Sequence, residues 1–299
     1  MTLQWKGVMP AITTNFKEDL SVDHGFVARH CQWLVEHGCT GMVTPGSLGE
    51  GATLTGSEKG DLWRTCVRAV GDRVPVVAAI SALSTAEGMT MARLAADQGC
   101  RGLMVLPPYV YRGDWREMKA YVSSILSATR LSCMLYNNPV AYGTDFLPEH
   151  IHELASEHGN LDAVKESSTD IRRVTAIRAL TGDRLAIFVG VDDAIVEGIT
   201  MGAAGWIAGL ANALPKESVD LFNHTMKGDR PKADPLYHWF LPLLRMDTVP
   251  KFVQLIKLVQ QEVGMGNARV RPPRLELVGE EREAVLAVIH ETLNNRPVI

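Results

Sequence analysis

The chain has 299 residues, 46% of them hydrophobic and 21% charged, a balance typical of a folded globular enzyme rather than a disordered protein. Thirty basic against thirty-four acidic residues leave a formal net charge of −4, which argues against a nucleic acid as partner. The sequence contains no apolar run of about 18 residues or more, so we expect no membrane-spanning helix and no membrane partner.

The amino-terminal segment and the cysteines favour a cytoplasmic protein. The first ten residues lack the basic and then apolar pattern of a secretory signal. The five cysteines are odd in number, widely spaced and without a Cys-x-x-Cys pair. We therefore expect them to be small core residues in a reducing compartment, forming neither a disulfide framework nor a zinc site.

Short, continuously apolar runs alternate with helical patterns along most of the chain, as is typical of parallel strands buried on both faces. The expected strands occupy residues 7–14, 41–45, 75–80, 102–106, 132–136, 162–165, 185–189 and 205–210. Eight such strand–helix units close into a (β/α)8 TIM barrel, whereas five or six would favour an open sheet. The sequence therefore predicts an α/β fold of the barrel type.

Helix signals agree with this alternation and change its character after the eighth strand. Thr55 and Glu58 form a capping box at the start of one helix, and Pro148 marks the first turn of another. The last predicted helices occupy residues 217–226, 234–244, 249–263 and 280–293. We expect a barrel over residues 1–230 and a helical carboxy-terminal domain over 231–299, which packs on the barrel or on another subunit.

Lys165 ends the sixth predicted strand, and the carboxyl ends of the strands carry the active sites of such barrels. An apolar surrounding disfavours the ammonium form and lowers the pKa of a lysine, which makes a neutral amine available as nucleophile. Such an amine condenses with a ketone to form a Schiff base. The alternative is a lysine that extends to solvent or pairs with Glu166.

Two further groups are expected beside this lysine. Tyr136 ends the fifth predicted strand, and neighbouring strands lie about 4.8 Å apart, so its phenol could transfer protons there. Alternatively, Tyr136 is a barrel-rim aromatic bonded to backbone. The loop 46–50 places Ser47 between glycines, and its amides could bind a carboxylate. Together these groups predict a nucleophile, a proton relay and an anion site in one barrel mouth.

The motifs that carry these residues resemble those of the dihydrodipicolinate synthase/N-acetylneuraminate lyase family. They are Gly-Ser-Leu-Gly-Glu at 46–50, Tyr-Asn-Asn-Pro at 136–139, Val-Lys-Glu-Ser at 164–167, Gly-Val-Asp-Asp at 190–193 and Val-Arg-Pro-Pro at 270–273. The resemblance covers nearly the whole chain. It implies Lys165 as the Schiff-base lysine, Tyr136 as the proton relay, Ser47 as the carboxylate binder, a homotetramer built as a dimer of dimers, and neither metal nor other cofactor.

The sequence departs from the synthase pattern at three places. Leu48 stands where a second hydroxyl is usual, and Ala141 stands where the synthase has an arginine for its second substrate's carboxylate. Val110 stands where the family has a tyrosine that crosses the subunit interface, and Tyr109 or Tyr111 could replace it. The residues that we expect to contact substrate, besides the three catalytic ones, are Gly46, Leu48, Tyr109, Tyr111, Tyr142 and Ile207.

The stretches 106–111 and 137–144 look most like the 1-pyrroline-4-hydroxy-2-carboxylate deaminases of hydroxyproline breakdown. The preferred prediction is therefore a deaminase that releases 2-oxoglutarate semialdehyde and ammonia, because its single carboxylate agrees with Ala141. The alternatives are a dihydrodipicolinate synthase, a pyruvate-dependent sugar-acid aldolase or dehydratase, and a barrel that binds a small 2-oxo or imino acid without catalysis. A metal enzyme is disfavoured because the histidines lie mostly in predicted helices, although Asp192 and Asp193 could hold a cation.

Overall fold

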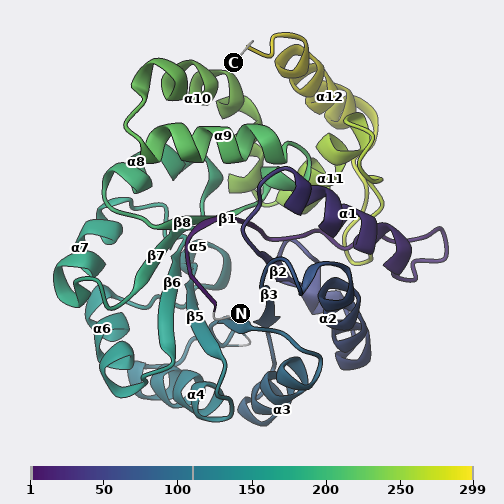
Figure 1. Cartoon of the computed structure of the whole chain (residues 1–299). Helices are drawn as coiled ribbons and strands as arrows, with labels where there is room; N and C mark the ends of the chain where they lie inside the picture. Colours follow the sequence, from purple (N-terminus) through teal and green to yellow (C-terminus); the bar gives the residue numbers. More distant parts are fainter. Residues whose placement is uncertain (1–2, 110, 298–299) are drawn as a thin grey trace.

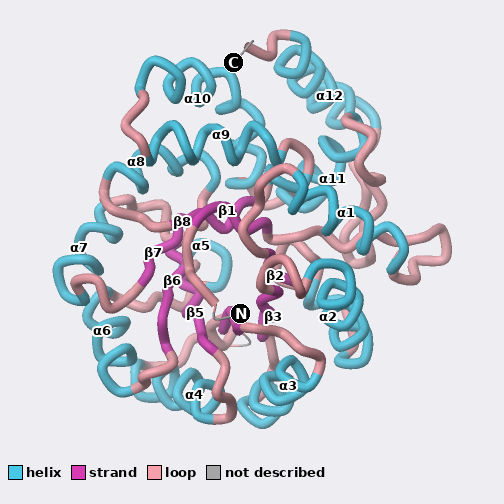
Figure 2. Tube along the Cα trace, in the orientation of Figure 1, coloured by secondary structure: helices cyan, strands magenta, loops and turns pink. Residues whose placement is uncertain are grey.

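At the centre of the molecule, eight parallel strands form one sheet in the order β1-β8-β7-β6-β5-β4-β3-β2. The computed structural model describes residues 3–109 and 111–297. The strands are β1 (Gly7–Pro10), β2 (Met42–Thr44), β3 (Val76–Ile80), β4 (Gly102–Val105), β5 (Ser132–Asn137), β6 (Leu161–Glu166), β7 (Ala186–Val189) and β8 (Gly205–Ala208). A parallel bridge between Ala11 and Val43 joins the two ends of this order, which closes the predicted barrel (Figure 2).

All eight predicted strands are confirmed, with different ends. β1 stops at Pro10 rather than at residue 14. Ala11 still bridges Val43, but beyond Ile12 the chain leaves the sheet and the Thr13 amide donates to Asn212 Oδ1 at 3.1 Å. β8 stops at Ala208 because a short 3-10 helix begins at Leu210. β5 and β6 each continue one residue past the predicted end, so Tyr136 and Lys165 are their next-to-last residues.

Most of the helices surround the strands on the outside, whereas the short α5 lies over the barrel (Figure 1). They are α1 (His24–Glu36), α2 (Gly56–Val70), α3 (Thr85–Asp97), α4 (Trp115–Ser127), α5 (Pro139–Tyr142), α6 (Pro148–Glu157), α7 (Arg172–Thr181), α8 (Ile195–Thr200), α9 (Pro215–Met226), α10 (Arg230–Leu244), α11 (Phe252–Glu262) and α12 (Gly279–Asn294). Four 3-10 helices connect them: η1 (Gly51–Thr53), η2 (Asp192–Ala194), η3 (Leu210–Asn212) and η4 (Arg245–Thr248).

Two helices start as predicted, and two others start at different residues. Thr55 and Glu58 cap α2 reciprocally, at 3.2 Å and 2.9 Å, and Pro148 is the first residue of α6. α10 begins at Arg230 rather than at 234, because Pro231 lies in its first turn, where a missing N–H costs little. The predicted helix 249–263 begins at Phe252, after η4.

The carboxy-terminal helices pack against the barrel within the same chain. α10 lies against α9 and α12 (Figure 1), and its residues Phe240 and Leu244 are fully buried, as is Ile256 of α11. Among the described residues, none of the helices combines the length and the apolar character needed to cross a bilayer. The five cysteines are buried and free, as expected of core residues.

Candidate active site

Lys165 and Tyr136 lie side by side at the carboxyl ends of two neighbouring strands. They are directly paired in the register of β5 and β6, and the Lys165 Nζ lies 4.2 Å from the centre of the Tyr136 ring. Both residues are buried. Glu166 does not pair with Lys165, because its carboxylate accepts from Asn137 Nδ2 at 3.0 Å and from the Ser168 amide at 2.6 Å. The alternative in which Lys165 pairs with Glu166 is therefore wrong.

A cavity of about 450 Å³ brings most of the predicted site residues together. Its lining includes Gly46, Ser47, Leu48, Tyr136, Tyr142, Lys165 and Ile207. Tyr109 and Tyr111 are absent from the lining formed by the described residues: Tyr111 is 60% exposed, and the Tyr109 ring lies 6.0 Å from the Tyr142 ring. Val110 lies outside the described residues.

Burial sets the charge of the lysine. Removal from water lowers the pKa of Lys165 to about 8, and the carboxyl groups of Asp247 and Asp192 oppose that shift. A pKa near 8 leaves about a tenth of the amine neutral at pH 7, whereas an ordinary lysine would have less than about a thousandth. The cavity therefore holds a usable nucleophile near neutral pH.

Two carboxyl groups lie near this amine. Asp192 accepts hydrogen bonds from Trp206 Nε1 and from the amides of Gly209 and Leu210, at 2.7–3.1 Å, while burial raises its pKa to about 6. Asp247 comes from η4 and lines the cavity, and burial raises its pKa well above the ordinary value. The sequence indicated Asp192 as a possible cation ligand or as a residue at a helix N-terminus, and it gave no indication of Asp247.

The loop that carries Ser47 is a tight turn at the cavity wall. The Glu50 amide donates to Ser47 O at 3.1 Å and the Gly51 amide donates to Gly46 O at 3.0 Å. A side chain at Gly51 would lie 2.5 Å from Pro45 O, so the turn needs glycine there. These turn bonds do not use the amides of Ser47 and Leu48, which leaves both N–H groups for an anion in the cavity.

Tyr142 connects this loop to Tyr136. Its phenol hydrogen-bonds the Ser47 hydroxyl, and its ring meets the Tyr136 ring edge-on at 5.9 Å. Burial raises the pKa of both phenols. Asn138 caps the short helix α5 that carries Tyr142, and its Nδ2 donates to the Tyr136 hydroxyl at 2.9 Å. Ser47 opposes the rise in the pKa of Tyr136, as expected if the three hydroxyl groups lie close together at the cavity wall, where they could transfer protons.

The remaining lining bears on ligand binding. Ser167 Oγ is buried and has no hydrogen-bond partner among the described residues, so it is available to a ligand. Ala141 lines the cavity, without a charge, at the position where we noted the missing arginine. No three His, Cys, Asp or Glu side chains of residues 3–109 and 111–297 gather closely enough to hold a metal ion.

Comparison with known proteins gives a consistent match over nearly the whole chain. Residues 4–292 match the model of the Dihydrodipicolinate synthetase family. The chain is similar to the 4-hydroxy-tetrahydrodipicolinate synthase of Methanothrix thermoacetophila, with 31% identity over 94% of this chain and 95% of that protein.

Solved structures agree. A putative dihydrodipicolinate synthetase from Pseudomonas aeruginosa superposes with a TM-score of 0.91 at 28% identity, covering 97% of this chain and 100% of that one. The dihydrodipicolinate synthase from Acinetobacter baumannii, solved with pyruvate, superposes with a TM-score of 0.90 at 25% identity, covering 97% of this chain and 99% of that one.

Proposed function

Because the chain belongs to the dihydrodipicolinate synthetase family, we propose that it is a lyase in which Lys165 forms a Schiff base with pyruvate or a related 2-oxo acid. The observation that carries this proposal is the buried, partly neutral amine beside the Tyr136 phenol in the cavity at the mouth of the barrel. Tyr136 and Ser47 act with it as proton relay and carboxylate binder.

The reaction begins with attack of the neutral Lys165 amine on the keto carbon. The carbinolamine then loses its hydroxyl as water, for which Tyr136 supplies a proton, and the imine forms. Ser47 and the amides of Ser47 and Leu48 hold the carboxylate. The Tyr136 phenolate takes a proton from the carbon next to the imine, which gives an enamine. The enamine adds to the carbonyl carbon of a second reactant, whose oxygen takes up that proton and becomes a hydroxyl. Attack on the imine carbon by water, or by an amine of the product, then releases Lys165.

For the second reactant we propose an aldehyde, as in a 4-hydroxy-tetrahydrodipicolinate synthase, rather than the hydroxyproline-derived imine that the sequence favoured. The similar proteins from Methanothrix thermoacetophila, Pseudomonas aeruginosa and Acinetobacter baumannii are all named as synthases or synthetases of this kind. The deaminase stays as a second candidate because Ala141 supplies no guanidinium for a second carboxylate.

A substrate panel separates these candidates. Condensation of pyruvate with aspartate semialdehyde is expected, with a pyruvate adduct on Lys165 after borohydride reduction. Release of ammonia from 1-pyrroline-4-hydroxy-2-carboxylate without that condensation would establish the deaminase instead. Pyruvate release from a sugar acid would support the aldolase alternative. Absence of any adduct would reject the Schiff-base lyase and leave the binding barrel.

The pH dependence of adduct formation tests the lysine. With a pKa of about 8, the rate of pyruvate trapping by cyanoborohydride should rise about tenfold per pH unit up to pH 8 and then level off. Asp247→Asn removes a negative charge that favours the ammonium form, so the midpoint should move to lower pH. A midpoint near that of free lysine would contradict the proposed burial.

Tyr142→Phe tests the second phenol. The substitution keeps the ring and removes the hydroxyl that bonds Ser47, so we expect kcat to fall by about 100-fold with little change in KM. Tyr121→Phe is the matched control, since Tyr121 is buried, its hydroxyl has no hydrogen-bond partner among the described residues, and it lies outside the cavity lining. Equal losses in the two variants, or a normal kcat in Tyr142→Phe, would remove Tyr142 from the relay.

The oligomeric state, the cellular location and the division into domains are proposed as follows. We propose a homotetramer in the cytoplasm, which sedimentation of the purified protein and fractionation of cells would test. The division into a barrel (1–230) and a helical carboxy-terminal domain (231–299) is likewise proposed. η4 and the chain after α11 come from the second part and line the cavity, so the site needs both parts.

A further inference from the structure

The cavity holds a second cation that the proposed chemistry does not use. Arg274, on the chain between α11 and α12, lines the same cavity as Lys165, and these two are the cationic residues of the lining within the described part of the chain. Arg274 is partly exposed, so it lies where the cavity meets solvent. Burial raises the pKa of Tyr142 and the positive charge of Arg274 opposes that rise, as expected for a guanidinium that lines the same cavity as this phenol.

The Arg274 guanidinium has no acceptor of its own. Its backbone amide donates to Arg271 O at 3.2 Å, but its side chain forms no ion pair and no hydrogen bond with residues 3–109 or 111–297. Arg271, three residues earlier, pairs instead with Glu58 at 2.8 Å. A partly buried guanidinium with an open fork is suited to a carboxylate, which it can bind through two parallel hydrogen bonds.

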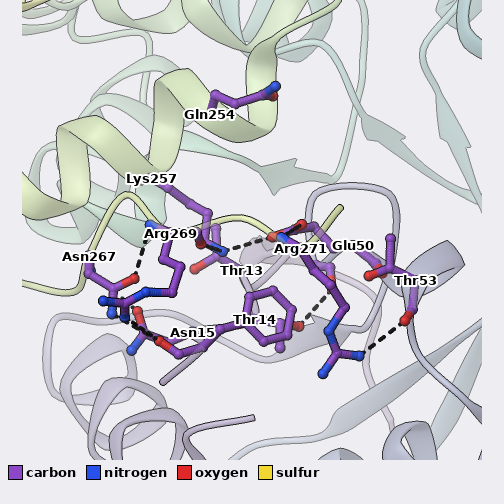
Figure 3. A network of polar contacts seen from close by, with 12 residues as sticks. Thr13, Thr14, Asn15, Glu50, Thr53, Gln254, Lys257, Asn267, Arg269 and Arg271 are labelled. Carbon is purple, nitrogen blue, oxygen red and sulfur yellow. Dashed lines mark hydrogen bonds and ion pairs between the residues drawn. The ribbon is translucent and has the colours of Figure 1, made fainter. Parts of the chain in front are cut away.

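The segment that carries Arg274 is fixed on both sides. Figure 3 shows the Arg271 side of this attachment: its amide donates to Glu50 Oε2 at 2.9 Å, and its guanidinium donates to Thr53 O at 3.0 Å. On the other side, Gln254 Nε2 donates to Leu275 O at 3.3 Å. Glu50 also ends the loop that carries Ser47. Its bond to the Arg271 amide therefore fixes the segment of Arg274 relative to the proposed carboxylate site at Ser47.

We propose that Arg274 binds a carboxylate at the end of the reacting molecule remote from the Schiff base, and so selects dicarboxylic reactants. The substrate class is a 2-oxo diacid, or an aldehyde that carries its own carboxylate and becomes one end of the imine-bound product. This inference rests on the proposed Schiff base at Lys165. Arg274 then supplies, from a different part of the chain, the positive charge for a second carboxylate that Ala141 cannot supply.

Borohydride trapping with a ladder of 2-oxo acids tests this without a second substrate. Pyruvate has one carboxylate, and oxaloacetate, 2-oxoglutarate and 2-oxoadipate place a second one at increasing distance. Wild-type protein should form the adduct at lower concentration with at least one diacid than with pyruvate. In Arg274→Ala, the half-saturating concentration for that diacid should rise roughly 10- to 100-fold, while pyruvate stays within about twofold.

Two further variants make the result specific. Arg274→Lys keeps the charge without the planar fork and should retain part of the preference. Arg230→Ala removes an exposed arginine outside the cavity, paired with Asp234, and should change neither acid. Absence of a diacid preference in the wild type, or parallel losses for pyruvate and the diacid in Arg274→Ala, would overturn the role of Arg274. Failure of wild-type protein to form any adduct would instead reject the Schiff base itself.

Discussion

Replacing Lys165 with alanine should abolish the pyruvate adduct and lower kcat/KM by at least about a thousandfold, because no other group can form the imine. The reason lies in the cavity: Lys165 is its one lysine among the lining residues that the structure describes. Intact-mass measurement after borohydride reduction gives the adduct directly. Turnover of pyruvate with the second reactant gives the loss of activity.

The matched control is a second desolvated lysine. Burial also lowers the pKa of Lys59, but its Nζ donates to Ser81 O at 3.1 Å and it lies outside the cavity lining. Peptide mapping of wild-type protein should therefore find the adduct on Lys165 and not on Lys59. An adduct that persists in Lys165→Ala would place the chemistry on another amine and refute the proposed site.

The sequence predicted the barrel and the pair at its centre because both follow from short-range patterns. Continuously apolar runs between helices specify buried parallel strands, and adjacent strands of a parallel barrel align their carboxyl ends. That alignment predicts Tyr136 beside Lys165, and the register of β5 and β6 confirms it. The turn at 46–50 could be predicted for the same reason, because its glycines and its hydrogen bonds are close together in the sequence.

Asp247 and Arg274 could not be found in this way. Both lie in the carboxy-terminal part of the chain, where the pattern indicates helices and connections that cover the barrel. Nothing in the local sequence says which residues of a covering segment will reach the cavity, because that depends on how the segment is anchored. Tyr142 was named as a substrate contact, but its bond to Ser47 depends on the short helix α5, which the pattern did not indicate.

The position of Arg274 in the cavity changes which reactants the site is expected to accept. From the sequence, Ala141 alone removed the guanidinium for a second carboxylate and so favoured a reactant with a single carboxylate. In the folded chain, Arg274 lies in the same cavity. The absence of an arginine at one motif position is therefore weak grounds for excluding a dicarboxylic reactant, because a cavity built from two parts of the chain can supply that charge from either.

The second large effect concerns stability at the junction of those two parts. Lys257 of α11 and Glu50 form an ion pair at 2.7 Å, with side chains 1% and 0% exposed (Figure 3). Lys257 Nζ also donates to Arg269 O at 2.5 Å and lies 4.7 Å from the centre of the Phe16 ring. Breaking one partner of a buried pair leaves the other charge unpaired inside the protein, which is strongly destabilising.

Lys257→Met should therefore lower the free energy of unfolding by about 3–5 kcal/mol and the melting temperature by roughly 10 °C, as measured by chemical and thermal denaturation. The double variant Lys257→Met/Glu50→Gln should recover part of this loss, because it removes the unpaired carboxylate while glutamine still offers an oxygen to the Arg271 amide. Exposed Lys216, paired with Asp220 on α9, is the control, and Lys216→Met should cost less than about 1 kcal/mol.

Lys257→Met should also weaken ligand binding, which a pair with a purely structural role would not do. Glu50 joins the Ser47 loop to the Arg271–Arg274 turn, so its displacement should raise the half-saturating concentrations of pyruvate and of the diacid together. Arg274→Ala should affect the diacid alone. If Lys257→Met unfolds no more easily than Lys216→Met, the pair does not hold the two parts together. If it is destabilised but binds both acids normally, the cavity does not depend on that junction.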